Sequence, residues 1–161
     1  MKKALSIIAA MLLIDILYGC STGVRPDGYL GFSKQDFTVV DEMDHHGGLH
    51  GDWYYYLILD CSDHTETALK NVEGWKKLPL SENLDIIMYS REKDDIHYMY
   101  NLSEEAHMPE IENGYYYFMD QDSESEELYD DSELLNHYVF NFTLAVYDSD
   151  TDIFYYFEFY T

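Results

Sequence analysis

The strongest constraint on the fold is a two-residue alternation in two segments near the C-terminus. One face of YVFNFTLAV (138–146) is aromatic or aliphatic, and so is one face of IFYYFEFY (153–160). The side chains on these faces are Tyr138, Phe140, Phe142, Leu144 and Val146, then Ile153, Tyr155, Phe157 and Phe159. A period of two is typical of half-buried strands, and the link YDSDTD (147–152) is rich in turn residues. The sequence therefore predicts a C-terminal β-hairpin.

Four further segments are predicted to be strands, and one a helix. The strands are FTVVDEM (37–43), WYYYLILDC (53–61), LDIIMY (84–89) and GYYYFMD (114–120). The helix is SDHTETALKNVEGW (62–75), with apolar residues at helical spacing and a capping-box pattern at its start. The predicted class is α+β, with about six mostly antiparallel strands and one main amphipathic helix packed on one face.

Predicted faces and loops complete this outline. In WYYYLILDC, the set Tyr55, Leu57, Leu59 and Cys61 is expected to face the core. Leu69, Val72 and Trp75 of the predicted helix are expected to cover the C-terminal hairpin. Residues 90–113 are expected to be loop, with a helical turn near 103–106. The acidic segment 121–133 is expected to be solvated, because its like charges repel.

The N-terminus carries an export pattern. Lys2 and Lys3 precede an apolar run over residues 4–14, which is shorter than the roughly 20 residues that span a bilayer. The motif Leu17-Tyr18-Gly19-Cys20 resembles the lipobox of bacterial lipoproteins. The resemblance implies a signal peptide at 1–19 and lipidation of Cys20, which would anchor the protein in the membrane at its extracytoplasmic face. The alternative is a buried N-terminal helix. Residues 20–36 are then a tether, and 37–161 a single domain.

Charge narrows the classes of partner. The chain has 9 basic and 32 acidic side chains and a net charge of −23. A negative charge of this size disfavours the binding of nucleic acid, because the phosphates are bound by Lys and Arg. Cationic, peptide or glycan ligands remain possible, and a monomer is expected.

The second cysteine, Cys61, ends an apolar strand between acidic neighbours, so it is expected to be a buried and unreactive thiol.

One segment, DHHGGLHGDW (44–53), has the composition of a metal site. His46, His50 and Asp52 are candidate ligands, with Asp44 as a possible addition, and zinc is the preferred ion for such a set. The alternative is a glycine-rich loop between two strands, because glycine permits tight turns.

Several segments together resemble a group of short, uncharacterised bacterial proteins. They are HGGLHGD (46–52), LILDCSD (57–63), WKKLPLSENL (75–84), ENGYYYFMD (112–120) and the closing hairpin. The group has no assigned activity, so the resemblance supplies no catalytic residues. It does imply that HGGLHGD is part of the domain. His45 and Trp53 depart from the shared pattern, which favours His46, His50 and Asp52.

The 17 tyrosines leave two interpretations open. They can form a glycan or peptide platform, or they can simply pack on both faces of a sheet, where tyrosine is favoured. The predicted function is a tethered binding module without chemistry of its own. The rival is a metal-dependent hydrolase that uses the HGGLHGD segment. A third possibility is an immunity-type protein that offers its acidic surface to a basic partner.

Overall fold

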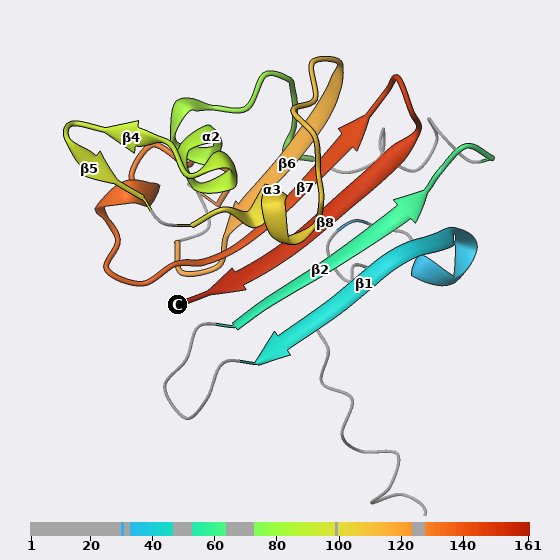
Figure 1. Ribbon diagram of the computed structural model, residues 1–161, viewed down its shortest axis with the longest axis horizontal. Helices are drawn as coiled ribbons and strands as arrows, with labels where there is room; N and C mark the ends of the chain where they lie inside the picture. The colour runs from blue at the N-terminus through green and yellow to red at the C-terminus, as the bar shows by residue number, and fades with distance from the viewer. Residues whose placement is uncertain (1–29, 31–32, 47–52, 64–72, 99, 124–127) are drawn as a thin grey trace, which may run out of the picture.

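The protein is an α+β domain built on one antiparallel sheet, as Figure 1 shows. The computed structural model describes residues 30, 33–46, 53–63, 73–98, 100–123 and 128–161, without the side chain of His46. Its six-stranded sheet has the order β1-β2-β8-β7-β6-β3, and β4 and β5 form a separate small hairpin. The elements are η2 (Lys34–Asp36), β1 (Thr38–His46), β2 (Trp53–Asp60), β3 (Trp75–Lys77), α2 (Glu82–Tyr89), β4 (Glu92–Lys93), β5 (Ile96–His97), α3 (Leu102–Glu105), β6 (Gly114–Asp120), η4 (Leu134–Asn136), β7 (Asn141–Asp148) and β8 (Ile153–Tyr160).

The predicted C-terminal hairpin is confirmed as β7 and β8. Phe142 lies opposite Phe159, and Leu144 lies opposite Phe157. The strand starts at Asn141, so Tyr138 precedes it and is fully exposed. The Asp148 side chain stabilises the turn between the two strands. Its carboxylate accepts hydrogen bonds from the Asp150 amide and the Thr151 hydroxyl.

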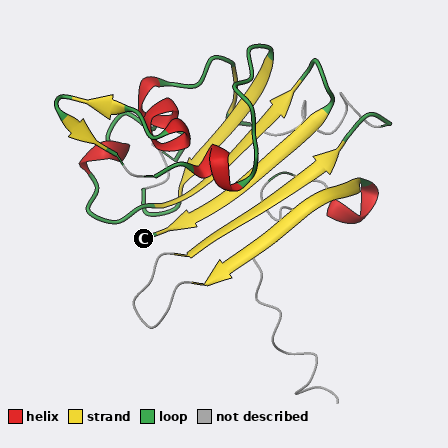
Figure 2. Ribbon diagram, viewed as in Figure 1, coloured by secondary structure: helices red, strands yellow, loops and turns green. Residues whose placement is uncertain are grey.

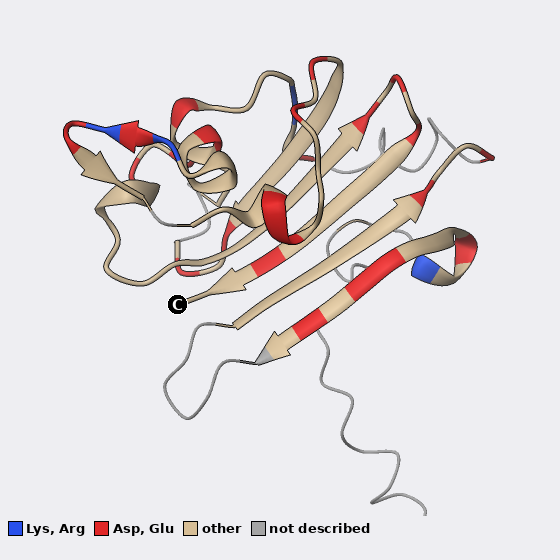
Figure 3. Ribbon diagram, viewed as in Figure 1, with Lys and Arg blue, Asp and Glu red and all other residues tan. Residues whose placement is uncertain are grey.

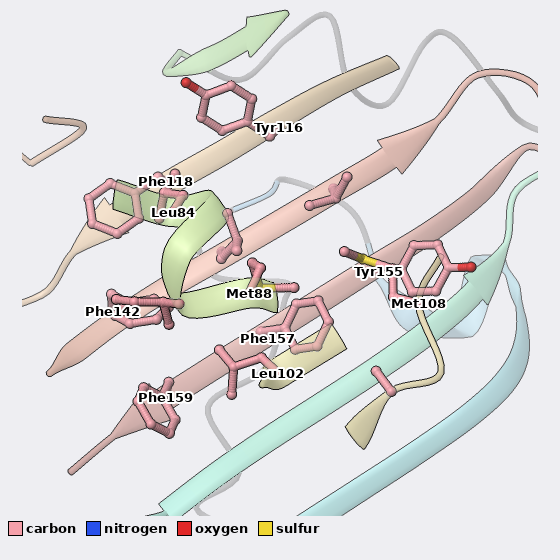
Figure 4. Close-up of a cluster of buried hydrophobic side chains, with 14 of the residues drawn as sticks. Leu84, Met88, Leu102, Met108, Tyr116, Phe118, Phe142, Tyr155, Phe157 and Phe159 are labelled. Atoms are coloured by element: carbon pink, nitrogen blue, oxygen red, sulfur yellow. The ribbon is translucent and has the colours of Figure 1, made fainter. Parts of the chain in front are cut away.

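Helices α2 and α3 both cover one face of this sheet, which we call the helix face (Figure 2). Figure 4 shows how their side chains meet the aromatic rings of β7 and β8. Leu84, Ile87 and Met88 of α2 and Leu102 of α3 are at most 4% exposed. The buried sheet residues beneath them include Tyr56, Ile58, Tyr116, Phe118, Phe142, Leu144, Val146, Tyr155, Phe157 and Phe159.

The main helix is not the predicted one. Residues 84–89, predicted to be a strand, belong to α2. Ser81 caps this helix by accepting a hydrogen bond from the Leu84 amide, and the left-handed Ser90 ends it. Leu84, Ile87 and Met88 have helical spacing, but in so short an apolar run the period alone does not separate a helix from a strand.

The helix predicted over 62–75 is wrong at its C-terminal end. Residues 64–72, with Leu69 and Val72, lie outside the described part of the chain. Trp75 starts strand β3 and lies opposite Tyr117 of β6. Its ring packs against Tyr117 and Phe154 on the face away from α2 and α3. Trp75 therefore does not cover the C-terminal hairpin from the helix side.

The second face of the sheet is also apolar and buried. Tyr55, Leu57, Leu59 and Cys61 face a core, as predicted, but that core lies opposite the helices. The other β2 set, with Tyr56 and Ile58, lies under the helices, so β2 is buried on both faces. The second core contains Leu30, Tyr55, Leu57, Leu59, Cys61, Tyr117, Met119, Ala145, Tyr147, Phe154 and Tyr156.

Three segments outside the main sheet can be compared with their predicted structure. The helical turn expected near 103–106 is α3, capped by Asn101. Leu30 and η2 belong to the segment predicted as a tether, and Leu30 is fully buried against the second face. The acidic segment 121–133 is not wholly solvated, since Asp131 is buried and accepts a hydrogen bond from the Ser81 hydroxyl. Within the described residues, no helix has the length and apolarity needed to cross a membrane.

Candidate functional site

Strand β1 forms one edge of the sheet (Figure 1). Its residues from Thr38 to His45 are all exposed. Its pairing with β2 is continuous from Asp41, opposite Ile58, to His46, opposite Trp53. A bulge at Val40 interrupts the register before this stretch. No strand in the described part of the chain pairs with the outer side of β1. We call Asp41, Glu42 and Asp44 the acidic edge; Figure 3 shows their charges along β1.

On the helix face, two tyrosines of β2 orient carboxylates beside this edge. The Tyr56 hydroxyl donates to Asp41 Oδ2 at 3.1 Å. The Tyr54 hydroxyl donates to Glu105 Oε2 of α3, also at 3.1 Å. The exposed ring of His45 stacks on Tyr54, with 4.9 Å between the ring centroids. This side of the edge therefore combines flat aromatic surface with anionic oxygens.

The opposite face repeats the arrangement. The Trp53 indole donates through Nε1 to Asp44 Oδ1 at 2.9 Å, and the Tyr55 hydroxyl donates to Glu42 Oε1 at 2.8 Å. Lys34 Nζ lies 2.6 Å from the same Glu42 oxygen. The hydrogen bond from Lys34 lowers the pKa of Glu42, and burial raises the pKa of Tyr55. Glu42 is therefore ionised and Tyr55 neutral at pH 7.

Four consecutive β2 residues thus each donate a hydrogen bond to a carboxylate. Asp41 also accepts at Oδ1 from the Glu42 amide, and Glu42 also accepts from Lys34. An ionised carboxylate offers about four lone-pair positions, so Asp41 and Glu42 retain acceptor positions for a partner. Val39, Val40 and Met43 add apolar surface and are 43%, 56% and 41% exposed. Such a surface can bind an ammonium or guanidinium group that carries an aliphatic stem.

A buried carboxyl, Glu158, lies on the second face near this edge. It lies opposite Tyr55 of β2 and Thr143 of β7, is 1% exposed, and accepts a hydrogen bond from Tyr156 at 2.5 Å. Burial raises its pKa to about 7. The sequence analysis missed this residue, although it is the one charged side chain in the apolar segment IFYYFEFY.

The sequence-predicted site residues lie mostly outside the described part of the chain. Cys20, His50 and Asp52 are among them, and His46 ends β1 without a described side chain. Strand β1 extends further into DHHGGLHGDW than predicted, because Asp44 and His45 belong to it, whereas Trp53 starts β2 as predicted. Among the described residues, no three His, Cys, Asp or Glu side chains are placed to hold a metal ion. Zinc binding by His46, His50 and Asp52 stays a prediction.

The Cys61 thiol is 6% exposed, which confirms the predicted burial. Burial, with the nearby Asp60 and Asp152, raises its pKa to about 12. A thiol that stays protonated at neutral pH is a poor nucleophile.

A pocket of about 280 Å³ lies on the other side of the domain, beside α2. Arg91 lines this pocket. It forms an ion pair with Asp85 and donates a hydrogen bond to Glu110 Oε1 at 2.8 Å. The pocket's basic group is therefore already neutralised within the chain. The lining residues are Leu78, Pro79, Leu80, Asp85, Tyr89, Arg91, Glu110, Ile111, Glu112 and Val146.

No protein-family model matches the chain, and neither a curated protein nor a solved structure has significant similarity to it. The resemblance to short bacterial proteins stays a prediction. The chemistry of the acidic edge and the pattern of the N-terminus are the grounds on which a function can be inferred.

Proposed function

We propose that the protein is a lipid-anchored, extracytoplasmic binding protein that captures a basic segment of a peptide or protein partner at the acidic edge. It performs no chemistry on that partner. The observation that carries the proposal is the acidic edge itself, an exposed sheet edge whose carboxylates are oriented by a row of aromatic donors.

Three properties of the protein support a basic partner. Asp41, Glu42 and Asp44 lie within one exposed strand, so an approaching cation meets several negative charges at once. The net charge of −23 attracts cations over longer distances and increases the rate of encounter. The ion pair of Lys34 with Glu42 has the geometry of the contact that a partner's lysine would make, and at Glu42 such a lysine would have to displace Lys34.

The N-terminal pattern supports the location. A positive start, an apolar run of sub-bilayer length and Leu17-Tyr18-Gly19-Cys20 are together typical of a lipoprotein signal. An acylated Cys20 would hold the domain close to the membrane on its outer side, where basic extracellular peptides and proteins are accessible.

The test is binding of a fluorescent lysine-rich peptide to the full chain in detergent, measured by anisotropy. The edge variant is Asp41→Asn/Glu42→Gln/Asp44→Asn. The matched control is Glu92→Gln/Asp94→Asn/Asp95→Asn, which removes equal charge from the exposed β4–β5 hairpin. We expect at least a tenfold loss of affinity in the edge variant and less than a twofold loss in the control.

Ionic strength provides the second readout. Binding through exposed charges should weaken as salt rises, because the screening length shortens to about 3 Å at 1 M. Equal losses of affinity in the edge and control variants would mean that net charge alone attracts the peptide, and the proposed site would be wrong.

A further inference from the structure

Three donor side chains surround Tyr54 of β2 on the helix face. Met43 Sδ of β1 lies 3.8 Å from the Tyr54 hydroxyl oxygen, and Glu105 Oε2 of α3 lies 3.1 Å from the same oxygen. The His45 ring stacks on the Tyr54 ring, with 4.9 Å between the centroids. Met43 and His45 are two residues apart in one strand, so their side chains point to the same face of the sheet. A thioether and an imidazole therefore lie together over one aromatic ring.

The soft donors of this group are accessible and are not used in hydrogen bonds. The Tyr54 hydroxyl has one proton, and a carboxylate is a stronger acceptor than a thioether, so the proton goes to Glu105. The Met43 sulfur therefore keeps its lone pairs. Neither ring nitrogen of His45 has a hydrogen-bond partner among the described residues. Met43 is 41% exposed, and His45 is exposed as well.

This combination of ligands suits a soft metal ion. Thioether sulfur selects copper(I), and imidazole also binds copper well. Calcium and magnesium ions take oxygen ligands instead, and zinc prefers four ligands drawn from thiolate, imidazole and carboxylate. The ring of Tyr54 adds attraction, because the face of an aromatic ring binds a cation within about 6 Å of its centre. The carboxylate of Glu105 provides negative charge next to this ring.

We propose that Met43 and His45 bind one copper(I) ion over the Tyr54 ring, with Glu105 as the neighbouring negative charge. The site is independent of the proposed capture of a basic partner, because neither donor belongs to the acidic edge. It shares no residue with the predicted zinc site. Because one of its donors is a thioether, it also differs from the clusters of His, Cys, Asp and Glu that are absent from the described residues.

The first measurement observes the Met43 sulfur directly. The full chain carrying Cys20→Ser, which removes a competing thiol, is titrated in detergent with silver(I), a soft ion that does not change its oxidation state. Isotope-labelled methionine methyl groups are followed by NMR, and Met43→Leu, which conserves apolar volume, identifies the Met43 signal. We expect this signal to shift with silver, while the signals of the buried Met88 and Met108 stay in place.

The second measurement is the affinity for copper(I), determined without oxygen by competition with bicinchoninate. His45→Phe keeps a stacked ring but removes both nitrogens. Even the outer partners of a metal ligand contribute roughly 10–100-fold in affinity, so Met43→Leu and His45→Phe should each weaken binding by at least tenfold. The controls are His97→Phe, at an exposed histidine of β5, and His46→Ala/His50→Ala. Neither control should change the affinity by more than about twofold.

Four results would overturn the site. The first is a Met43 methyl signal that does not move in excess silver. The second is a shift that His45→Phe leaves unchanged, because the thioether would then bind alone. The third is an equal loss of copper affinity in His45→Phe and in either control, which would place the ion at other histidines. The fourth is zinc binding as tight as that of copper(I), since a thioether site favours the softer ion.

Discussion

Glu158 is the one ionisable carboxyl in the otherwise apolar strand β8. It is 1% exposed and has the Tyr156 hydroxyl as a hydrogen-bond donor, while its cross-strand neighbours are Tyr55 and Thr143. Burial favours the neutral acid, and its pKa rises from 4.5 to about 7. In the unfolded chain the same carboxyl ionises near pH 4.5. The folded state therefore loses stability as pH rises from about 4.5 to about 7.

Glu158→Gln should remove this loss. At pH 8 we expect the variant to be more stable by up to roughly 3 kcal/mol, since each pKa unit corresponds to about 1.36 kcal/mol. At pH 4.5 or below the gain should vanish, because both states are then largely protonated. Urea unfolding at the two pH values measures the difference, with the exposed Asp95→Asn as control. An equal change at both pH values would contradict the assigned burial of an ionisable Glu158.

At the scale of elements, α2 depends on a cap that also satisfies a buried charge. The Ser81 side chain accepts from the Leu84 amide at 3.3 Å and donates to the carboxylate of Asp131, which is 6% exposed. Asn83 donates to the Asp131 carbonyl at 2.8 Å. Ser81 and Asn83 therefore both connect the start of the helix to the segment before η4.

Ser81→Ala should lower the free energy of unfolding by more than the loss of an ordinary helix cap does. Loss of the cap costs about 1 kcal/mol, and a buried carboxylate deprived of a donor adds roughly 1–3 kcal/mol. Thermal unfolding should show the lower stability, whereas Ser149→Ala in the exposed β7–β8 turn should change it little. If the two variants unfolded at the same temperature, the Ser81–Asp131 contact would have no structural role.

For the whole molecule, the prediction concerns attachment to the membrane. If Cys20 carries the lipid, Cys20→Ser should move the protein from the membrane fraction to the soluble fraction and abolish labelling with a fatty-acid probe. Cys61→Ser is the matched control, because Cys61 is buried in the second core and should leave fractionation unchanged. Continued labelling of the Cys20→Ser variant would exclude the lipoprotein assignment.

The sequence alone determined the elements whose pattern is local and unbroken. Strict alternation over 138–146 and 153–160 predicted the closing hairpin, and the bounds of β6 follow the apolar run GYYYFMD. In YVFNFTLAV and IFYYFEFY, large apolar side chains recur at every second position, so the period predicts a strand without knowledge of its neighbours. Both faces of β7 and β8 are nevertheless buried, which the period does not show. The predicted α+β class follows from the same patterns.

Tertiary structure alone decided which elements meet. Residues 84–89 have an apolar run that suits a strand or a helix, and the cap at Ser81 with burial against β7 and β8 makes it a helix. Trp75 joins the sheet because β6 offers it a pairing edge. The acidic edge depends on the register between β1 and β2. Asp41, Glu42 and Asp44 reach the aromatic donors of β2 only in the observed pairing. Pairing between strands depends on contacts distant along the chain, which local periodicity does not encode.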